Sequence, residues 1–579
     1  MRKSDIPLEK IVYVRPAVRY VPKRLRKFFA LDTETMPDGT PLMICSSEGD
    51  VWKVEDIPRC FFSRKYRGST FFVYNLRFDA GVLLRWLPKK CLRDLIEYGV
   101  CEYEKYIVEY IPHKFLKIRT FKDNVKFFDL LQFYGCSLET ASQKYLGEGK
   151  MEIETKKFTR EYVDKHWDEI RRYCIRDAEL TKRLAETLIR HLHRFGVDTD
   201  KFYSSAYLGS VYLRKKQAMN DVWKFWTRTP SVIEYALKSY RGGKFEMVKR
   251  GCAYMYEYDL RSAYPAELRN CVDLRHTYAI HSRKYETSAV YGFLKCRISV
   301  PDVLHHSVGM FEGNVQTYPV GAFTAYITKQ EYDWLIQRGC DVEILDGWWI
   351  IPDRIEYVYR DVVDELYRLK EKYRGQNDML SHIAKIMLNG LYGKMIQMIP
   401  DLFGEVRAGP LFNPIHASVV TANVRLKVSD IQNQYPDDIV AVHTDSVISL
   451  RPLGIETKEN IIGTWKYETE GIGVMILCGI YQVGSKVATR CYSVEKDVDW
   501  FEYLRQGGKS TKVKIVQTRA ISWIESVQME KYNPCEFVEE EKELDINIDR
   551  KRVWIHHTNC EKLLQGIETS IPYIRMEVI

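Results

Sequence analysis

The alternation of hydrophobic and polar positions along the chain predicts where strands and helices fall. Residues 441–450 alternate on both sides of a short polar break, which predicts a β-hairpin with Asp445 at its tip. Apolar stretches predict buried strands at 27–36, 70–74 and 125–131. A helical period predicts helices over 159–196, 354–373 and 378–395. An acid on a hairpin tip is a good ligand for a hard metal ion, but one acid cannot hold two metals.

Three acidic residues accompany the first two predicted strands. Asp32 and Glu34 share one face of the first strand, because strand side chains alternate. The second strand breaks at Asn75, and Asp79 then opens an amphipathic helix. Such acids are expected at the edge of a sheet and not in its core.

The long helix over 159–196 adds a fourth acid. Thr159 is expected to cap this helix, and Ser137 a shorter one before it. Tyr173 and Asp177 stand four residues apart, hence on one face. Carboxylates gathered in a dry site repel one another, so their joint presence predicts divalent cations. Two metals roughly 3.5–4 Å apart can generate hydroxide and stabilise the leaving oxygen of a phosphodiester.

A second carboxylate for the hairpin is supplied by the stretch AYMYEYDLRSAYP, an apolar strand that ends at Asp259. Ser262 and Tyr264 follow it, and a helix is expected to start at Pro265. Just before this strand comes YRGG, 240–243, in which the glycines allow close backbone approach. Read alone, YRGG is equally typical of a tight turn between domains.

The helix over 378–395 carries Lys385, Asn389 and Tyr392 on one face, because they lie at i, i+4 and i+7. A lysine there can hold a triphosphate as a point charge, and the tyrosine can lie under a base. An isolated KxxxN would be better read as an ordinary helix with a solvated lysine.

Composition limits the class of protein. The 579 residues exceed one ordinary core, so three or four domains are expected. No run of eighteen apolar residues occurs, and the 14 cysteines form no CxxC pair, which predicts a soluble cytoplasmic protein (the host's cytoplasm, if viral) with reduced thiols. The net charge of +9 favours a polyanionic partner. Residues 1–28 hold nine Lys or Arg against two acids, which predicts an extended basic arm, either phosphate-binding or solvated.

Two further segments are less specific. Residues 271–352 are expected to form a mixed insertion with several short strands. The basic stretch 507–519 suits a small domain that grips a duplex backbone, and the acidic tail from 536 is expected to face solvent.

Taken together, the motifs LDTETM, YNLRFDAG, YCIRD, YRGG, YDLRSAYP, KIMLNGLYGK and HTDS resemble those of the family B DNA polymerases. The resemblance covers about residues 28–490 and is strongest to the compact protein-primed branch of bacteriophages and linear mobile elements. It implies an α/β multidomain fold, with a DnaQ-like (RNase H-like) 3′–5′ exonuclease domain and a right-hand polymerase with palm, fingers and thumb. The implied divisions are a basic arm (1–28), the exonuclease domain (29–200), the palm (201–270 and 395–490), an insertion like the first terminal-protein region (271–352), the fingers (353–394), and the thumb with the tail (491–579).

The resemblance also implies the reaction and its participants. A DNA-directed DNA polymerase with 3′–5′ proofreading would replicate a viral or mobile-element genome by two-metal nucleotidyl transfer. The implied cofactor is Mg²⁺, two ions in each active site, with Mn²⁺ as a substitute. The implied partners of a monomeric enzyme are primer–template DNA, single-stranded DNA and dNTPs, with no membrane partner. A terminal protein as primer is left open.

Site residues follow by matching each motif. Metal ligands at the polymerase site would be Asp259, Asp445 and the carbonyl of Leu260. Metal ligands at the exonuclease site would be Asp32, Glu34, Asp79 and Asp177, with Tyr173 orienting the attacking water and Lys150 as a matching lysine. The nucleotide would be bound by Leu260, Tyr264, Lys385, Asn389 and Tyr392, with Tyr264 excluding a ribose 2′-hydroxyl. DNA would be contacted by Asn75, Phe78, Ser137, Leu138, Tyr240, Arg241, Gly242, Gly243, Ser262, Gly393 and Tyr481.

The sequence departs from the family pattern in four places. Gly390 replaces a serine, with the loss of a hydroxyl and some added backbone freedom. Gly479 replaces the lysine of a KxY motif, for which Lys466 or Lys486 is a substitute. His443 replaces an aspartate, so we expect weaker metal affinity and a rate that falls as this histidine gains a proton near its reference pKa of about 6.5. The segment 395–413 is short for the second insertion, which bears on processivity and strand displacement.

Two other functions compete with an active polymerase. An inactivated family B paralogue would only bind primer–template; the altered HTDS motif and the missing KxY lysine favour it, and the retained Asp259, Asp445, Lys385 and Tyr392 oppose it. A nuclease whose polymerase half serves as a DNA clamp is the third alternative. Primer extension and primer degradation distinguish the three.

Overall fold

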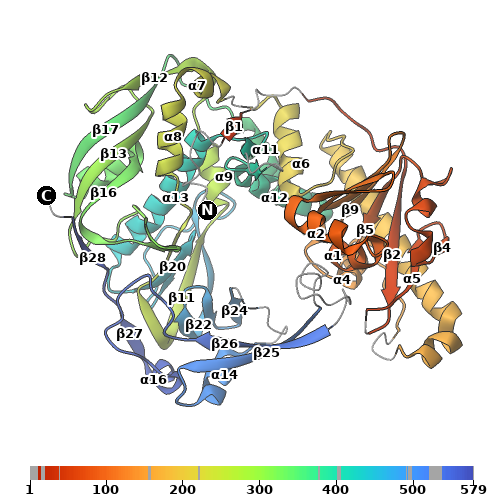
Figure 1. Ribbon diagram of the computed structural model, residues 1–579. Helices are drawn as coiled ribbons and strands as arrows, with labels where there is room; N and C mark the ends of the chain where they lie inside the picture. Colours follow the sequence, from red (N-terminus) through yellow and green to blue (C-terminus); the bar gives the residue numbers. More distant parts are fainter. Residues whose placement is uncertain are drawn as a thin grey trace.

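The computed structural model describes residues 11–14, 20–37, 39–153, 158–219, 222–375, 378–400, 406–490, 492, 498–520 and 537–577. Three large sheets organise these residues (Figure 1). We call them the N-terminal sheet, the central sheet and the insertion sheet. A core cluster of buried side chains runs without interruption from the N-terminal sheet through α5, α6 and α12 to α13, so the three parts share one interior.

The N-terminal sheet has the strand order β4-β3-β2-β5-β9-β8-β7-β6, with β2, β5 and β9 parallel. Its strands are β2 (Phe28–Thr35), β3 (Pro41–Ser46), β4 (Val51–Trp52), β5 (Thr70–Val73), β6 (Val100–Tyr103), β7 (Tyr106–Ile111), β8 (Phe115–Arg119) and β9 (Asn124–Asp129). Its helices are η3 (Val54–Asp56), η4 (Arg59–Phe62), α1 (Leu76–Leu83), α2 (Lys89–Tyr98), α3 (Leu131–Tyr134), α4 (Leu138–Leu146) and α5 (Arg160–Arg194).

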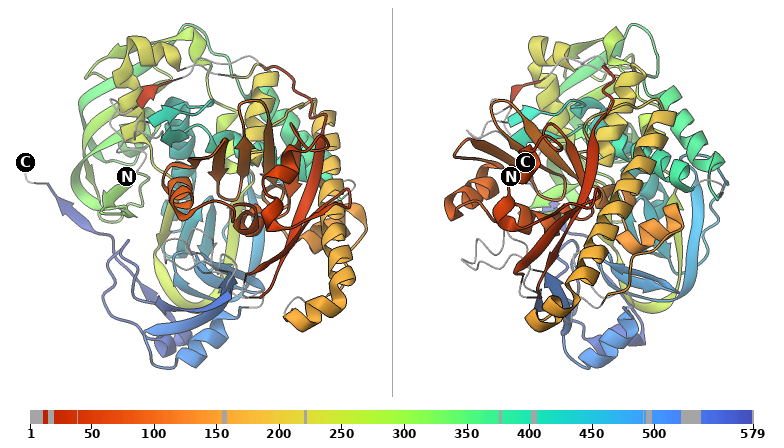
Figure 2. Two further views of the ribbon diagram at one scale, coloured as in Figure 1. Left: turned by 45° about the vertical axis from the view of Figure 1, so that its right-hand side comes forward. Right: turned by 90° about the vertical axis from the view of Figure 1, so that its right-hand side faces the viewer.

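The local signals of this region are confirmed. Helix α5 runs along the sheet beside β2 and β3 (Figure 2). The hydroxyl of Thr159 accepts from the backbone N–H of Tyr162, and Ser137 caps α4 in the same way through Thr140. Asn75 has φ +74°, and this left-handed residue makes the break between β5 and α1.

The central sheet has the order β10-β20-β21-β11-β22-β23-β24, and β27 also pairs with β11. Its strands are β10 (Lys244–Met247), β11 (Lys249–Leu260), β20 (Ile439–Thr444), β21 (Ser446–Ser449), β22 (Trp465–Leu477), β23 (Ile480–Val483), β24 (Lys486–Thr489) and β27 (Ile567–Thr569). Its helices and those leading to it are α6 (Ser205–Lys215), α7 (Trp223–Arg228), α8 (Pro230–Ser239), α9 (Ala263–Leu268) and α13 (Pro414–Gln434). The predicted hairpin is β20–β21. His443 pairs with Ser446, so Asp445 lies in the turn at the tip.

The helix expected from Pro265 begins two residues earlier, at Ala263. Ser262 has φ +48° and turns the chain sharply out of β11, so the helix can start at once.

The insertion sheet has the order β12-β17-β13-β16-β28. Its elements are η6 (Leu274–His276), β12 (Thr277–His281), β13 (Tyr291–Val300), β16 (Val320–Thr328), α10 (Lys329–Gln337), β17 (Asp341–Pro352) and β28 (Ile574–Met576), with a small pair β14 (Met310–Glu312) and β15 (Val315–Thr317) beside it. The expected strands exist, but β13 and β17 have 10 and 12 residues and are not short.

Two antiparallel helices follow, α11 (Arg360–Lys372) and α12 (Asp378–Gly393). The expected start of the first helix at 354 is wrong by six residues. Tyr357 forms a β-bridge with Val272, and the N–H of Asp273 donates to the carbonyl of Glu356. These pairings hold the segment extended, so a helix cannot include it.

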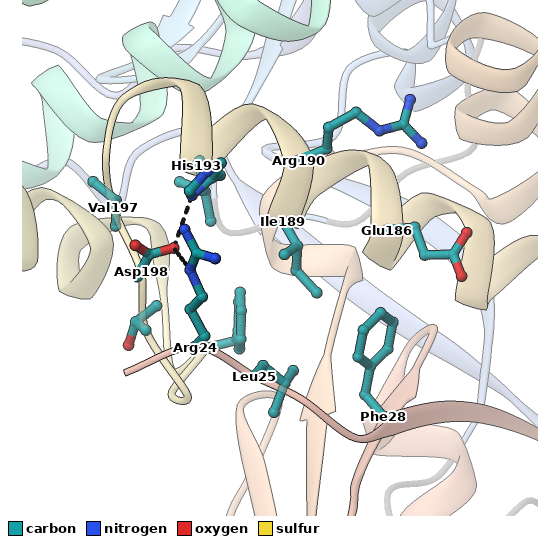
Figure 3. A pocket seen from close by; sticks show the side chains of 12 residues that line it. Arg24, Leu25, Phe28, Glu186, Ile189, Arg190, His193, Val197 and Asp198 are labelled. Atoms are coloured by element: carbon teal, nitrogen blue, oxygen red, sulfur yellow. Dashed lines mark hydrogen bonds and ion pairs between the residues drawn. The ribbon is translucent and has the colours of Figure 1, made fainter. Parts of the chain in front are cut away.

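The expected basic arm is docked and not free. Its residues 1–10 and 15–19 lie outside the described part of the chain. Strand β1 (Ile11–Tyr13) pairs in parallel with β19 (Val406–Ala408), which also pairs with β18 (Met398–Pro400). Further on, Arg24 and His193 converge on Asp198 at the rim of a cavity of about 420 Å³ (Figure 3). The arm therefore ties the middle of the chain to the end of α5.

The acids of the C-terminal segment face solvent as expected, since Glu541 and Glu543 are exposed, and they also pair with the basic stretch. Strand β25 (Lys512–Ala520) pairs with β26 (Phe537–Asp545), next to α14 (Trp500–Gly507) and α16 (Cys560–Gln565). Lys512 pairs with Glu543 and Lys514 with Glu541, both at 3.0 Å, so acids of the tail neutralise lysines of the basic stretch. The chain then adds β27 to the central sheet and β28 to the insertion sheet. Among the described helices, none is both long and apolar enough to cross a membrane.

Gly390 has a packing role that the expected added freedom does not explain. A Cβ at Gly390 would lie 2.5 Å from Cα of Ala206 on α6. Gly209 of α6 lies equally close to α12, where its Cβ would meet the carbonyl oxygen of Met387 at 2.9 Å. The two glycines let α6 and α12 approach until their backbones touch, and any side chain would separate the helices.

We therefore predict that Gly390→Ser lowers the free energy of unfolding by about 1–3 kcal/mol, because the new Cβ overpacks this contact. Gly393→Ser, on the same helix, is the control, since a Cβ there meets nothing within 4 Å. Urea unfolding followed by fluorescence measures both. Equal stability of the two variants would contradict the packing role.

Candidate active sites

Asp259 and Asp445 are brought together by the central sheet. Strand β11 pairs with β21 so that Asp259 lies opposite Ser446, next to the hairpin tip. The N–H of Leu260 donates to the carbonyl of Asp445 at 2.8 Å, and this bond ties the end of β11 to the tip. Thr444 adopts φ +66°, which leaves a two-residue turn that turns Asp445 out of the strand.

Burial and proximity make this pair electrostatically strained. Burial first, and the charge of Asp259 second, raise the pKa of Asp445 to about 7. The pKa of Asp259 is also raised by burial, against the opposing effect of Lys466. The ammonium of Lys466 lies 3.1 Å from the Asp259 carboxylate and 2.5 Å from Glu468. A cation thus already lies against this pair.

Three tyrosines of different motifs meet beside the carboxylates. The ring of Tyr264 stacks on Tyr392 at 4.9 Å between centroids, with 22° between planes. The hydroxyls of Tyr392 and Tyr240 lie 3.0 Å apart. A Cβ at Gly243 would meet the Tyr264 hydroxyl at 2.7 Å, so the glycine is needed for this approach. These contacts join YRGG, YDLRSAYP and α12 around one point.

The expected nucleotide-binding face of α12 is present. Lys385 and Asn389 are exposed and Tyr392 is half-buried, and Gly393 follows at the exposed end of the helix. Sequence reasoning missed Lys370 of α11 as a residue of this site. Its ammonium donates to the Ser262 hydroxyl at 3.5 Å, and the charge of Lys385 is one of the causes that lower its pKa, after burial. Lys370 is therefore a second cation near the end of β11.

The YRGG segment is held by a buried arginine that sequence reasoning missed. Arg425 of α13 is fully buried and donates to the carbonyls of Arg241 and Gly242 at 2.8 and 3.0 Å. Its remaining nitrogens bind the Ser307 carbonyl and the Glu331 carboxylate. No motif includes Arg425, and helix α13 carries many polar residues, so no signal in the sequence drew attention to it.

Two of the expected DNA-contacting residues are engaged elsewhere in the fold. The guanidinium of Arg241 donates to the carbonyls of Gly309 and Lys238. Tyr481 is 5% exposed, and its hydroxyl donates to Glu257 at 3.1 Å. Both side chains hydrogen-bond to other parts of the protein beside the site. Their contact with DNA stays a prediction.

The expected pH effect of His443 is wrong. The ring lies between Tyr481, at 4.9 Å, and Phe245, at 4.8 Å, and is 9% exposed. Burial first, and then the charges of Lys551, Arg490 and Lys486, lower the pKa of His443 to about 3. The imidazole therefore stays neutral throughout the physiological range.

The second group of carboxylates converges at the edge of the N-terminal sheet. Asp32, Glu34 and Cys174 each offer a ligand atom within 4.8 Å of the others. Asp79 reaches the same strand from α1, where its carboxylate accepts from the Thr33 hydroxyl at 2.7 Å. These four residues come from β2, α1 and α5.

Helix α5 adds Asp177 and Tyr173, and a lysine joins them. The ammonium of Lys150 lies 2.5 Å from the Asp177 carboxylate and 4.9 Å from the centre of the Tyr173 ring. The other oxygen of Asp177 is buried and has no partner among the described residues. That oxygen is free to ligate a cation.

Repulsion dominates this site as well. Burial, together with the charge of Asp177, raises the pKa of Glu34 to about 8, and burial is the main cause that raises the pKa of Asp79 to about 8. The pKa of Asp32 is raised by burial and then by Asp79 and Asp177. The charge of Lys150 opposes this crowding, because it lowers the pKa of Glu34 and Asp177.

The residues expected to contact a single strand differ in exposure, and a cavity lies beside the acids. Asn75 and Ser137 are exposed and Phe78 is half-buried, whereas Leu138 is only 8% exposed. A cavity of about 940 Å³ opens between α4, α5 and the segment 150–153, and Lys150 and Tyr173 line it. Its position suits an extended strand that enters the site.

Asp129 is a residue that the sequence reasoning missed. Its carboxylate accepts from the N–H groups of Asn75 and Leu76, both at 3.0 Å, and so holds the first turn of α1. Burial raises the pKa of Asp129 to about 6, while these hydrogen bonds lower it. An acid at the end of strand 125–131 was the available signal.

We predict that, in EDTA, Glu34→Gln raises the free energy of unfolding by roughly 2–4 kcal/mol at pH 8. The folded-state pKa of Glu34, raised from 4.5 to about 8, means that folded protein binds more protons, so stability falls as pH rises between these values. The gain should therefore vanish near the lower value, and Mg²⁺ should reverse it. Glu55→Gln, at an exposed acid, is the control in thermal unfolding. An equal pH slope for wild type and Glu34→Gln would contradict the argument.

Comparison with known proteins is consistent with this geometry. Residues 144–399 match the family described as DNA polymerase type B, organellar and viral. The DNA polymerase of Acidianus bottle-shaped virus (isolate Italy/Pozzuoli) is 25% identical over 71% of this chain and 67% of its own length. A probable DNA polymerase of Podospora anserina is 22% identical over 49% of this chain, which spans 22% of that protein.

Solved structures show the fold. Phi29 DNA polymerase in an orthorhombic crystal form has a TM-score of 0.62 and 14% identity, over 89% of this chain and 99% of its own. Its ternary complex with primer–template DNA and incoming nucleotide has a TM-score of 0.60 and 13% identity, over 90% and 100%. The expected arrangement of an exonuclease domain joined to palm, fingers and thumb is confirmed. Residues 144–399 of the chain are therefore similar to the type B DNA polymerases of organelles and viruses, and its fold is similar to that of phi29 DNA polymerase.

Proposed function

We propose that this protein is a DNA-directed DNA polymerase with a 3′–5′ proofreading exonuclease, and that it replicates a viral or mobile-element genome. One observation carries the proposal: Asp259 and Asp445, far apart in sequence, lie at adjacent strand ends with raised pKa values. The domain boundaries inferred from the sequence, and priming by a terminal protein, stay predictions.

The residues of both sites fit divalent cations. Each site gathers buried carboxylates whose pKa values are raised, so each gains when a cation replaces a proton. Asp259, Asp445 and the Leu260 carbonyl would hold Mg²⁺ at one site, and Asp32, Glu34, Asp79 and Asp177 at the other. When bound, such ions activate an attacking oxygen and stabilise the leaving one.

At the polymerase site, the chain's own groups bind and orient the substrates. Lys385 would neutralise the triphosphate, with Lys370 close to the same region. The Tyr264–Tyr392 stack would form a wall beside the sugar and base, and Tyr240 and Ser262 would border the primer. Exposed Asn389 and Gly393 leave room for the base pair at this wall.

At the exonuclease site, Lys150 holds the positions of Tyr173 and Asp177. The Tyr173 hydroxyl would orient the attacking water, and it stays protonated because burial raises its pKa. Asn75, Phe78, Ser137 and Leu138 would hold the frayed strand at the cavity beside the acids.

The test is extension and degradation of a labelled primer–template with Mg²⁺. We expect Asp445→Ala to lose extension on the order of 10³-fold and to keep degradation. The pair Asp32→Ala and Glu34→Ala should do the reverse. If the wild-type protein degrades the primer but never extends it, the nuclease with a DNA-clamping half is the correct function. If it binds the duplex but neither extends nor degrades the primer, the protein is the inactivated paralogue.

The burial of His443 gives a further prediction. His443→Phe should keep the shape of the pH–rate profile between about pH 5.5 and 8.5, because a neutral ring replaces a neutral ring. His443→Ala should instead lower stability by about 1–3 kcal/mol, because it empties the space between Phe245 and Tyr481. A profile for His443→Phe that loses an inflection near pH 6.5 would show that the histidine titrates.

A further inference from the structure

The hairpin β23–β24 places Arg490 where a motif residue is missing. Ile480 pairs with Thr489 and Tyr481 with Ala488, so Gly479 lies directly opposite Arg490. The N–H of Arg490 donates to the Gly479 carbonyl at 3.1 Å, which extends the ladder by one step. Residues directly opposite in an antiparallel pair share a face, so Arg490 lies on the same face as Gly479 and Tyr481.

Gly479 is required by this arrangement. It has φ +86°, and a Cβ built on it would meet Cδ of Arg490 at 2.9 Å and Cζ of Phe245 at 2.9 Å. The space above Gly479 is therefore filled by the side chain of Arg490. A cation absent from one strand is supplied by the opposite residue of the next strand.

Two cationic side chains lie against the ring of Phe245. The guanidinium carbon of Arg490 lies 3.8 Å from the ring centre, and the ammonium of Lys551 lies 4.7 Å from it. The Lys551 ammonium also donates to the Phe245 carbonyl at 2.5 Å. Within the described part of the chain, no carboxylate forms an ion pair with either cation. Two like charges on one ring can attract an anion.

This group of three residues, Phe245, Arg490 and Lys551, lies beside the polymerase carboxylates. Phe245 pairs with His443, which is two residues from Asp445, or roughly 7 Å along the strand. Arg490 is exposed and can reach a ligand.

We propose that Arg490, given room by Gly479 and held on Phe245 beside Lys551, binds the sugar–phosphate backbone of the strand whose 3′ end reaches Asp259 and Asp445. The ligand is a phosphodiester a few nucleotides behind that end. This inference rests on the proposed polymerase function and assigns Arg490, instead of Lys466 or Lys486, to the place of the missing lysine. The two lysines are already bound to acids, Lys466 to Asp259 and Lys486 to Glu257 at 2.7 Å.

The test measures affinity for a fluorescent primer–template by anisotropy in EDTA, over a range of salt concentrations. Arg490→Ala should raise the Kd about tenfold and lower the slope of log affinity against log salt by about one, as the loss of a phosphate contact does. Lys551→Met should lower the slope similarly. Arg93→Ala, at an exposed arginine on α2, is the matched control and should change neither quantity.

Gly479→Ala provides an independent variant, because it keeps the charge but displaces Arg490 from Phe245. Gly479→Ala as a single substitution should lower the affinity for the primer–template. Added to Arg490→Ala, it should change that affinity little. Thermal unfolding checks that each variant is folded. A salt slope equal to wild type for Arg490→Ala overturns the proposal, as does a raised dNTP KM with unchanged DNA affinity. Failure of wild type to extend a primer would instead overturn the polymerase function, because the binding assay needs no catalysis.

Discussion

The hydrogen bond from the N–H of Leu260 to the carbonyl of Asp445 fixes the constraint around which the fold is built. It joins the end of β11 to a hairpin almost two hundred residues later, and so forces two carboxylates into one partly buried place. Buried like charges repel, and burial together with the charge of Asp259 raises the pKa of Asp445. The flanking strands of the central sheet and the packed α13 supply the apolar contacts that offset this repulsion. A chain that only needed to fold would place neither acid there.

Both sites moderate their repulsion in the same way. At each, one lysine pairs with one carboxylate of the group, Lys466 with Asp259 and Lys150 with Asp177. Each lysine forms an ion pair with only one carboxylate of its group. The site therefore keeps a net negative charge, while the repulsion among its carboxylates is reduced. The lysines thus limit the repulsion within each site without removing the negative charge that attracts a cation.

The elements that could be predicted from the sequence are those set by near neighbours. The hairpin around Asp445, the strand with Asp32 and Glu34, and the caps at Ser137 and Thr159 depend on residues within one or two turns. The motifs also identified the acids of both sites. The pairing of β1 with β19 and the return of the tail as β27 and β28 could not be predicted, because their partners lie hundreds of residues away. Arg425 and Asp129 bind backbone groups of segments far away in the sequence, so no local pattern reveals these contacts.

The departures from the family pattern acquire meaning only beside their spatial neighbours. Gly390 is explained by the backbone of Ala206, and Gly479 by the side chain of Arg490. In each case the residue that replaces a polar motif residue is the one that gives room to a partner from another element. A missing side chain is therefore weak evidence of lost function until the residue opposite has been considered. His443 follows the same logic, since two rings enclose it and three nearby cations keep it neutral, so its pKa of about 3 is a property of the surrounding fold.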